Sequence, residues 1–298
     1  MVESPPGYES IHTSKHRSEC LELRLVLDAM GIFAETVHGD DGWTLVVKQD
    51  DRAAAAAEIE AYRRENAAGA TSPRIAEPVL GGAVVAVALY TGIISLLSIL
   101  TVRQGFGLDW LSAGRMQAGK VMAGEVWRTA TALTLHLDAE HLFANLLFGS
   151  VFGFLAGRLL GGGVAWLAIL IAGALGNFMN ATVQPPNHSS IGASTAVFAA
   201  LGMIVSHALR PRGEVATTPL RRWSPLIGGV LLLAFMGVGG ERTDVLAHVT
   251  GFMAGLLVGW AGCRLPHRWL ASGWTQWAAG IGALAIVIAA WTAALIAS

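Results

Sequence analysis

The fold is decided by residues 158–210, which read RLLGGGVAWLAILIAGALGNFMNATVQPPNHSSIGASTAVFAALGMIVSHALR. No Asp, Glu, Lys or Arg lies between the two terminal arginines. Because a helix crosses the hydrocarbon core of a bilayer with about 20 residues, this stretch is too long for one span. The turn-forming residues QPPN at 184–187 interrupt it. The stretch therefore predicts two membrane-spanning helices, at about 163–181 and 191–209.

Uncharged runs on both sides of this stretch predict five more spans. They lie at about 80–102, 140–160, 225–238, 244–262 and 276–296. The composition agrees, since 53% of the 298 residues are hydrophobic and only 14% are charged, against about 25% in soluble domains. The predicted fold class is an all-α polytopic membrane protein with seven transmembrane helices.

The first 72 residues differ from the rest, because they are polar and contain no long apolar run. Residues 20–30 predict an amphipathic helix, 33–38 and 43–47 predict a hairpin of two strands, and 50–66 predict a second helix. We therefore expect a small soluble α+β domain over 1–72 and a linker over 73–79.

Charge and cysteine content exclude several classes of function. The net charge is -1 and the pI is near 6.8, so the basic excess typical of nucleic-acid binding is missing and no nucleic-acid partner is expected. Cys20 and Cys263 lie far apart without CxxC spacing, which argues against a disulfide framework or a zinc site. The N-terminus has no apolar signal segment, so we expect the internal spans to direct membrane insertion.

The arginines of the short loops predict the orientation by the positive-inside rule. If the N-terminal domain is cytoplasmic, the inner side carries Arg158, Arg210, Arg212, Arg221, Arg222, Arg264 and Arg268. The short outer loops, 182–190 and 239–244, hold only Arg242. This topology places the starts of the second, fourth and sixth spans at the outer face. The Ala- and Gly-rich composition favours a bacterial inner membrane.

Four polar side chains lie within about two helical turns of those three starts. They are His141 and Asn145 on the second span, Ser194 on the fourth and His248 on the sixth. Polar groups inside a bilayer are costly and mark function or helix packing. Since a helix rises about 1.5 Å per residue, all four reach similar depths and could converge. His141 and Asn145 are four residues apart and share one helix face.

Three segments resemble motifs of the rhomboid family of intramembrane serine proteases. Residues 124–149, GEVWRTATALTLHLDAEHLFANLLFG, are similar to the family's Trp-Arg loop motif and the HxxxN of its second helix. Residues 191–202, IGASTAVFAALG, resemble its GxSG serine motif, and residues 247–255, AHVTGFMAG, resemble its AHxxGxxxG. The likeness covers about 80–265 and implies a six-helix core there, with 266–298 forming an additional C-terminal transmembrane helix.

The resemblance implies a serine endopeptidase with a Ser-His dyad. Ser194 would be the nucleophile and His248 its general base, while Asn145, His141 and the Ser194 N–H would hold the oxyanion. The implied substrates are transmembrane proteins that are cut near the outer membrane face. Membrane lipid is the other expected partner. No metal or organic cofactor is implied.

Several further residues are expected to support this site. Gly192 lets a backbone N–H or a substrate carbonyl approach Ser194 closely, and Phe198 lies one turn below, where the family often has a tyrosine stacked on the histidine. Gly251 and Gly255 form a GxxxG stripe that permits close helix packing. Ala196 and Ala200 of the fourth span are the small residues expected to face this stripe. In the first loop, we expect Trp127 to be an interfacial anchor and Arg128 to hold the loop through its guanidinium.

One residue departs from the family pattern, because Thr195 stands where a glycine usually follows the serine. A β-branched side chain could crowd the oxyanion hole, or its hydroxyl could bond a helix carbonyl. The alternative function is therefore a catalytically inactive rhomboid-like protein that binds transmembrane helices in trafficking or quality control. A transporter using His248 as a proton relay is a third possibility. His136 is interpreted as a hydrogen-bonding support of its loop, and His188 as a solvated loop residue.

Overall fold

The computed structural model describes residues 7–39, 42–67, 80–136, 138–210, 219–237 and 244–298. The chain divides into two compact units, Met1–Ala76 and Glu77–Ser298. The linker predicted at 73–79 and the tip of the predicted hairpin, 40–41, lie outside the described residues.

The first unit is a three-stranded antiparallel sheet with two helices. Its strands lie in the order β1-β3-β2. The elements are β1 (Tyr8–Ser14), α1 (Arg17–Ala29), β2 (Ala34–Gly39), β3 (Gly42–Lys48), the short 3-10 helix η1 (Gln49–Asp51) and α2 (Arg52–Ala67). Its core joins Leu23 and Leu27 of α1, Leu45 and Val47 of β3, and Ile59 of α2. The α+β class is confirmed, whereas β1 was not predicted from the polar N-terminus.

The second unit is helical, with a long helix at the place of each predicted span. Its long helices are α3 (Ala83–Val102), α7 (Ala139–Leu160), α8 (Gly162–Val183), α9 (Ser194–Ala208), α10 (Pro219–Gly237), α11 (Val245–Gly262) and α13 (Gly273–Ile296), and a short helix, α12 (His267–Leu270), precedes the last. Five of these, α3, α7, α8, α11 and α13, are long and apolar enough to cross a membrane. The protein is therefore an integral membrane protein.

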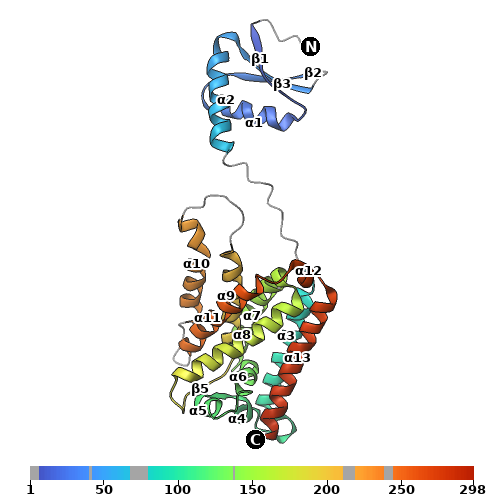
Figure 1. The fold of residues 1–298 in the computed structure, drawn as a ribbon, viewed down its shortest axis with the longest axis vertical. Helices are drawn as coiled ribbons and strands as arrows, with labels where there is room; N and C mark the ends of the chain where they lie inside the picture. Colours follow the sequence, from blue (N-terminus) through green and yellow to red (C-terminus); the bar gives the residue numbers. More distant parts are fainter. Residues whose placement is uncertain (1–6, 40–41, 68–79, 137, 211–218, 238–243) are drawn as a thin grey trace. The chain divides into compact units, whose positions relative to one another are not determined.

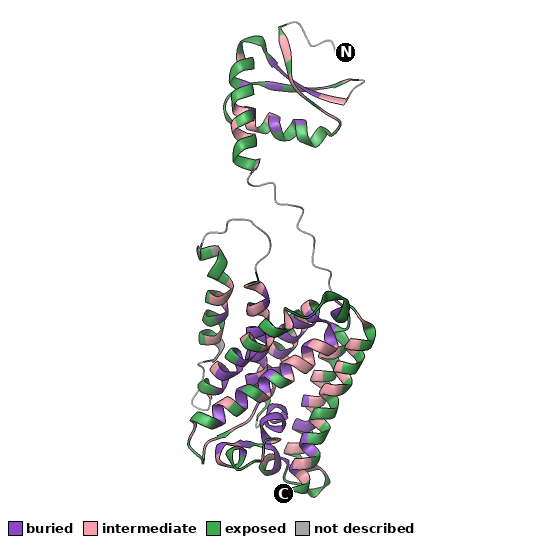
Figure 2. Cartoon of the chain, in the orientation of Figure 1, coloured by how far each residue is buried: buried purple, intermediate pink, exposed green. Residues whose placement is uncertain are grey.

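Helix α9 is enclosed by other helices, since it packs against α7, α8, α10 and α11 (Figure 1). The buried residues, purple in Figure 2, gather on α8, α9 and α11. With 15 residues, α9 is about 22 Å long, shorter than the hydrocarbon core of a bilayer. It begins three residues later than predicted, because Gly192 takes a φ of +116°, which a right-handed helix does not contain.

The packing of α9 on α11 depends on glycines, but its register differs from the prediction. A side chain added at Gly251 would strike Thr195, and one at Gly255 would strike the backbone of Ala199. The expected partners were wrong by one position, since Ala196 instead faces Gly173 of α8. Helix α9 is apolar on every face, so its sequence does not fix its rotation about its own axis.

The connection between α3 and α7, residues 103–138, is folded and not an extended loop. It contains η2 (Gly105–Gly107), α4 (Trp110–Gly114), β4 (Met116–Gln117), α5 (Ala118–Met122), α6 (Arg128–Thr131) and η3 (Ala132–Thr134). Strand β4 pairs with β5 (Ser189–Ser190), just before the serine motif. The buried guanidinium of Arg128 donates hydrogen bonds to the carbonyls of Ser112 and Arg115. We call residues 103–138 the first connection.

Candidate active site

The N-terminal ends of α9 and α11 bring a serine and a histidine together. Ser194 is the first residue of α9, and His248 lies in the first turn of α11. Nε2 of His248 lies 2.8 Å from Oγ of Ser194, a normal hydrogen-bond distance. The contact of Gly251 with Thr195 lies one turn beyond His248 on α11 and one residue beyond Ser194 on α9. Close helix packing therefore sets the distance between the two functional groups.

An aromatic ring supports the imidazole of His248. Phe198 lies one turn below Ser194, and its ring centroid is 4.5 Å from that of His248 at an interplanar angle of 39°. Both side chains are buried. The ring of Phe198 restricts the orientation of the imidazole, as the position of the residue in the sequence indicated.

His141 and Asn145 of α7 meet at Gly192, two residues before the serine. A side chain at Gly192 would lie 2.6 Å from Nε2 of His141 and 3.7 Å from Nδ2 of Asn145. Only glycine fits at position 192, because a side chain would collide with the His141 ring and because the backbone φ there is positive. The Asn145 amide donates to the carbonyl of His141 at 3.0 Å. The structure thus brings together the four polar residues that the sequence singled out.

The segment before Ser194 is held by the first connection. The N–H of Gly192 donates to the carbonyl of Ala132 at 2.9 Å, and the N–H of Ala193 donates to Nε2 of His136 at 3.4 Å. Nδ1 of His136 lies 3.4 Å from the hydroxyl of Ser98. Burial, with a smaller contribution from His141, lowers the pKa of His136 to about 3. The neutral ring can therefore accept from Ala193 through Nε2 and carry its proton on Nδ1.

A polar cluster around Asp244 begins α11, and the sequence reasoning missed it. Its carboxylate accepts from the N–H of Ala247 at 3.0 Å and from the Asn180 amide at 2.7 Å, and it lies 2.8 Å from Nε2 of His188. His188 is therefore bonded and not simply solvated. Burial by itself raises the pKa of Asp244, but its hydrogen bonds outweigh this and hold the pKa below its usual value. An Asp directly before an apolar helix is a capping signal that could have revealed the cluster.

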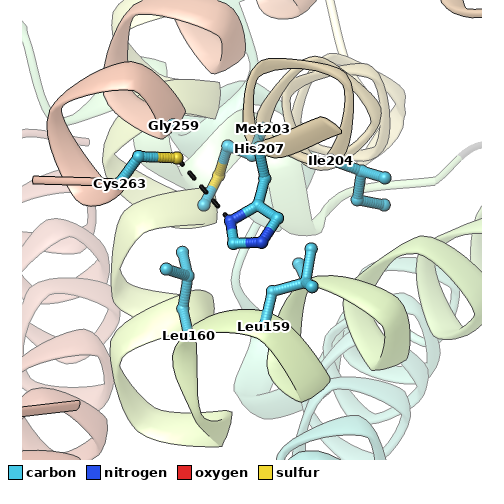
Figure 3. A pocket seen from close by; sticks show the side chains of 8 residues that line it. Leu159, Leu160, Met203, Ile204, His207, Gly259 and Cys263 are labelled. Atoms are coloured by element: carbon cyan, nitrogen blue, oxygen red, sulfur yellow. Dashed lines mark hydrogen bonds between the residues drawn. The ribbon is translucent and has the colours of Figure 1, made fainter. Parts of the chain in front are cut away.

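A pocket at the other end of α9 and α11 is separate from this site (Figure 3). It is lined by Leu159, Leu160, Met203, His207 and Cys263 among others. His207 is 13 residues beyond Ser194 on α9, which is about 20 Å along the helix. Within the described part of the chain, no group of three or more His, Cys, Asp or Glu could hold a metal ion.

Comparison with known proteins finds similarity to one family. Residues 123–265 match the family model for the rhomboid domain. The chain is 28% identical to Rhomboid-like protease 1 of Toxoplasma gondii over 148 residues, which cover 47% of this chain and 48% of that protein. It is 24% identical to Rhomboid protease GlpG of Haemophilus influenzae over 170 residues, 57% of this chain and 87% of that protein. A third relative, RHOMBOID-like protein 4 of Arabidopsis thaliana, is 31% identical over 173 residues, 57% of this chain and 42% of that protein. The chain thus spans about half the length of the Toxoplasma relative.

Proposed function

Because this protein belongs to the rhomboid family, we propose that it is an intramembrane serine endopeptidase whose catalytic dyad is Ser194 and His248. The observation that carries the proposal is the distance of 2.8 Å between Oγ of Ser194 and Nε2 of His248. A general base must lie within hydrogen-bond reach of the proton that it removes, and this pair meets that condition.

The reaction begins when His248 takes the proton of the Ser194 hydroxyl. The serine oxygen then attacks the scissile carbonyl, and the tetrahedral intermediate collapses as His248 returns the proton to the leaving amine. A water molecule, deprotonated by His248, hydrolyses the resulting acyl ester and regenerates the serine. The ring of Phe198 at 4.5 Å keeps the imidazole oriented through both halves of the reaction.

The oxyanion is held by Asn145, His141 and the backbone N–H of Ser194. The side chains of His141 and Asn145 border Gly192, on the side of the serine that the α7 helix covers. An amide nitrogen carries two hydrogens, so the bond from Asn145 to the carbonyl of His141 leaves its second hydrogen for the substrate oxygen. Donors fixed in this way stabilise charge that develops only in the transition state.

The position of Thr195 favours an active enzyme over an inactive relative. Its side chain is buried, and its Cγ2 methyl lies 2.9 Å from where a side chain at Gly176 or Gly251 would be. The methyl therefore fills the space that two glycines leave between α8 and α11. The two side-chain oxyanion donors, His141 and Asn145, come from α7 and border Gly192, whereas the Thr195 methyl points to α8 and α11, so it does not crowd them.

The substrates that we propose are transmembrane proteins, cut near the outer membrane face. The dyad lies at the N-terminal ends of α9 and α11, and the distribution of arginines in the sequence places those ends outside. The same reasoning supports a cytoplasmic N-terminus. The uncharged runs of the sequence support seven spans, and its Ala- and Gly-rich composition supports a bacterial inner membrane. Helices α9 and α10 contain apolar stretches shorter than 18 residues, so the seven-span topology rests on the charge distribution as well as on helix length.

The test is cleavage of a reporter transmembrane substrate by the purified protein in liposomes. Wild type should cleave, Ser194→Ala and His248→Ala should not, and Ser206→Ala, at the far end of α9, should behave like wild type. A wild type that is inactive while Thr195→Gly is active would show that the native protein is a pseudoprotease.

A further inference from the structure

Helix α13 lies outside the segment that matches the family model, yet it packs against the first connection. Trp291 is buried near the C-terminal end of α13, and its ring centroid is 5.0 Å from that of Trp110 in α4. The same apolar cluster includes Leu135, just after η3, and Ile191, just before Gly192. One end of α13 thus belongs to an apolar cluster that includes residues of both segments that flank the oxyanion site.

A hydrogen bond joins α13 to η3. The indole N–H of Trp291 donates to Oγ1 of Thr134 at 3.1 Å, and both side chains are buried. The Thr134 hydroxyl in turn donates to the carbonyl of Thr131 at 2.7 Å. Away from water, such a bond fixes the position of η3, because breaking it would leave buried polar groups without partners.

The residues around Thr134 hold the backbone beside the catalytic serine. Two positions before it, the carbonyl of Ala132 accepts the N–H of Gly192, and two positions after it, Nε2 of His136 accepts the N–H of Ala193. Thr134 therefore lies between the two groups that set the path of residues 192–193. A shift of η3 would move Gly192 relative to His141 and Asn145.

The other end of α13 is fixed to the opposite side of the bundle. Nε2 of Gln276 donates to the carbonyls of Leu160 and Leu270, and its Oε1 accepts the N–H of Val164. These bonds anchor α13 at the junction of α7 and α8. The helix is thus held at both ends, so that its Trp291 end is a fixed support for the first connection.

We propose that α13 positions the oxyanion site, and that Trp291 is a positioning residue that acts through Thr134 on Gly192 and Ala193. The inference rests on the proposed protease function and extends it to a helix beyond the family domain. Stabilisation of an oxyanion depends on donor distances of about 2.7–3.1 Å, so a small displacement of residues 192–193 lowers the rate of the chemical step more than it affects substrate binding.

The test uses the full chain and measures kcat, KM and the rate of fluorophosphonate labelling of Ser194. Trp291→Phe keeps an aromatic ring but removes the N–H, and it should lower kcat and the labelling rate about 3- to 10-fold, as expected for one lost buried hydrogen bond, with KM nearly unchanged. Thr134→Val should have a similar effect, and the double variant should be little slower than either single variant. Thr134→Ser keeps the hydroxyl and should restore most of the rate.

The control is Trp277→Phe, an exposed tryptophan on the same helix, which should leave all three quantities unchanged. If Trp291→Phe reduces expression of folded protein, the test rests on kcat and the labelling rate of Thr134→Ser compared with those of Thr134→Val. An active wild type whose kcat and labelling rate survive both Trp291→Phe and Thr134→Val would overturn this inference alone. A wild type that neither labels nor cleaves would overturn the proposed function as well.

Discussion

Thr195 packs against Gly251, and this contact joins α9 to α11 directly beside Ser194 and one turn from His248. A methyl group at Gly251 would strike the backbone carbonyl of Thr195 as well as its side chain. Since Ser194 precedes Thr195 and His248 lies three residues before Gly251, the distance between the two functional groups depends on this contact.

Gly251→Ala should therefore separate α11 from α9. We expect a loss of about 1–3 kcal/mol in unfolding free energy from overpacking, together with a loss of most Ser194 labelling. Gly92→Ala is the matched control, because the space around Gly92 in α3 is open. Thermal unfolding in detergent and labelling kinetics measure both effects. Unchanged labelling in folded Gly251→Ala protein would contradict this view of the site.

Thr195→Ala tests whether the threonine fills space or obstructs the reaction. Removing its methyl and hydroxyl leaves a small cavity between Gly176 and Gly251, so we expect a loss of about 1 kcal/mol in stability. The rate of substrate cleavage should change little, because the side chain does not face the oxyanion donors. A large increase in kcat would show instead that Thr195 hinders the native enzyme.

Asn145→Ala should remove an oxyanion donor while leaving the dyad in place. The expected decrease in kcat is about 10²- to 10³-fold, with KM nearly unchanged. Steady-state cleavage of the reporter substrate at several concentrations separates the two constants. An increase in KM at constant kcat would assign Asn145 to substrate binding and not to the transition state.

Asp244→Ala should loosen the start of the histidine helix. Loss of an N-cap costs about 0.5–2 kcal/mol, and here the bonds to Asn180 and His188 are lost as well. We expect lower thermal stability and reduced activity. Asp109→Ala is the comparison variant, because it removes the N-cap of the short helix α4, which does not carry His248. Equal losses of kcat in the two variants would mean that Asp244 has no particular effect on the site.

The pKa of His136 predicts a pH dependence of stability. The folded state excludes a proton until about pH 3, whereas the unfolded state binds it below its ordinary value of 6.5. The unfolding free energy should therefore fall as pH decreases from 6.5 towards 3. His136→Gln can still accept the N–H of Ala193 but does not titrate, so its stability should fall less steeply between pH 6.5 and 4. Parallel slopes for wild type and variant would argue against a buried neutral histidine.

The sequence predicted the helices and singled out four polar residues that the structure brings close together, for a simple physical reason. Long apolar runs must cross the membrane as helices, and costly polar groups at matching depths stand out from them. The rotation of α9 was not predictable in this way, because small apolar residues cover all its faces and either Ala196 or Ala199 could have faced α11. The short helices and the strand of the first connection were also not predicted, since they depend on tertiary hydrogen bonds such as those from Arg128 to the Ser112 and Arg115 carbonyls.

The most direct test of the central claim is to map the fluorophosphonate adduct by mass spectrometry in wild type, His248→Ala and Ser194→Ala. A dyad in which His248 activates Ser194 predicts one adduct, on Ser194, that is nearly absent from His248→Ala and absent from Ser194→Ala. Labelling of a different residue, or labelling of Ser194 that persists at the wild-type rate in His248→Ala, would contradict it.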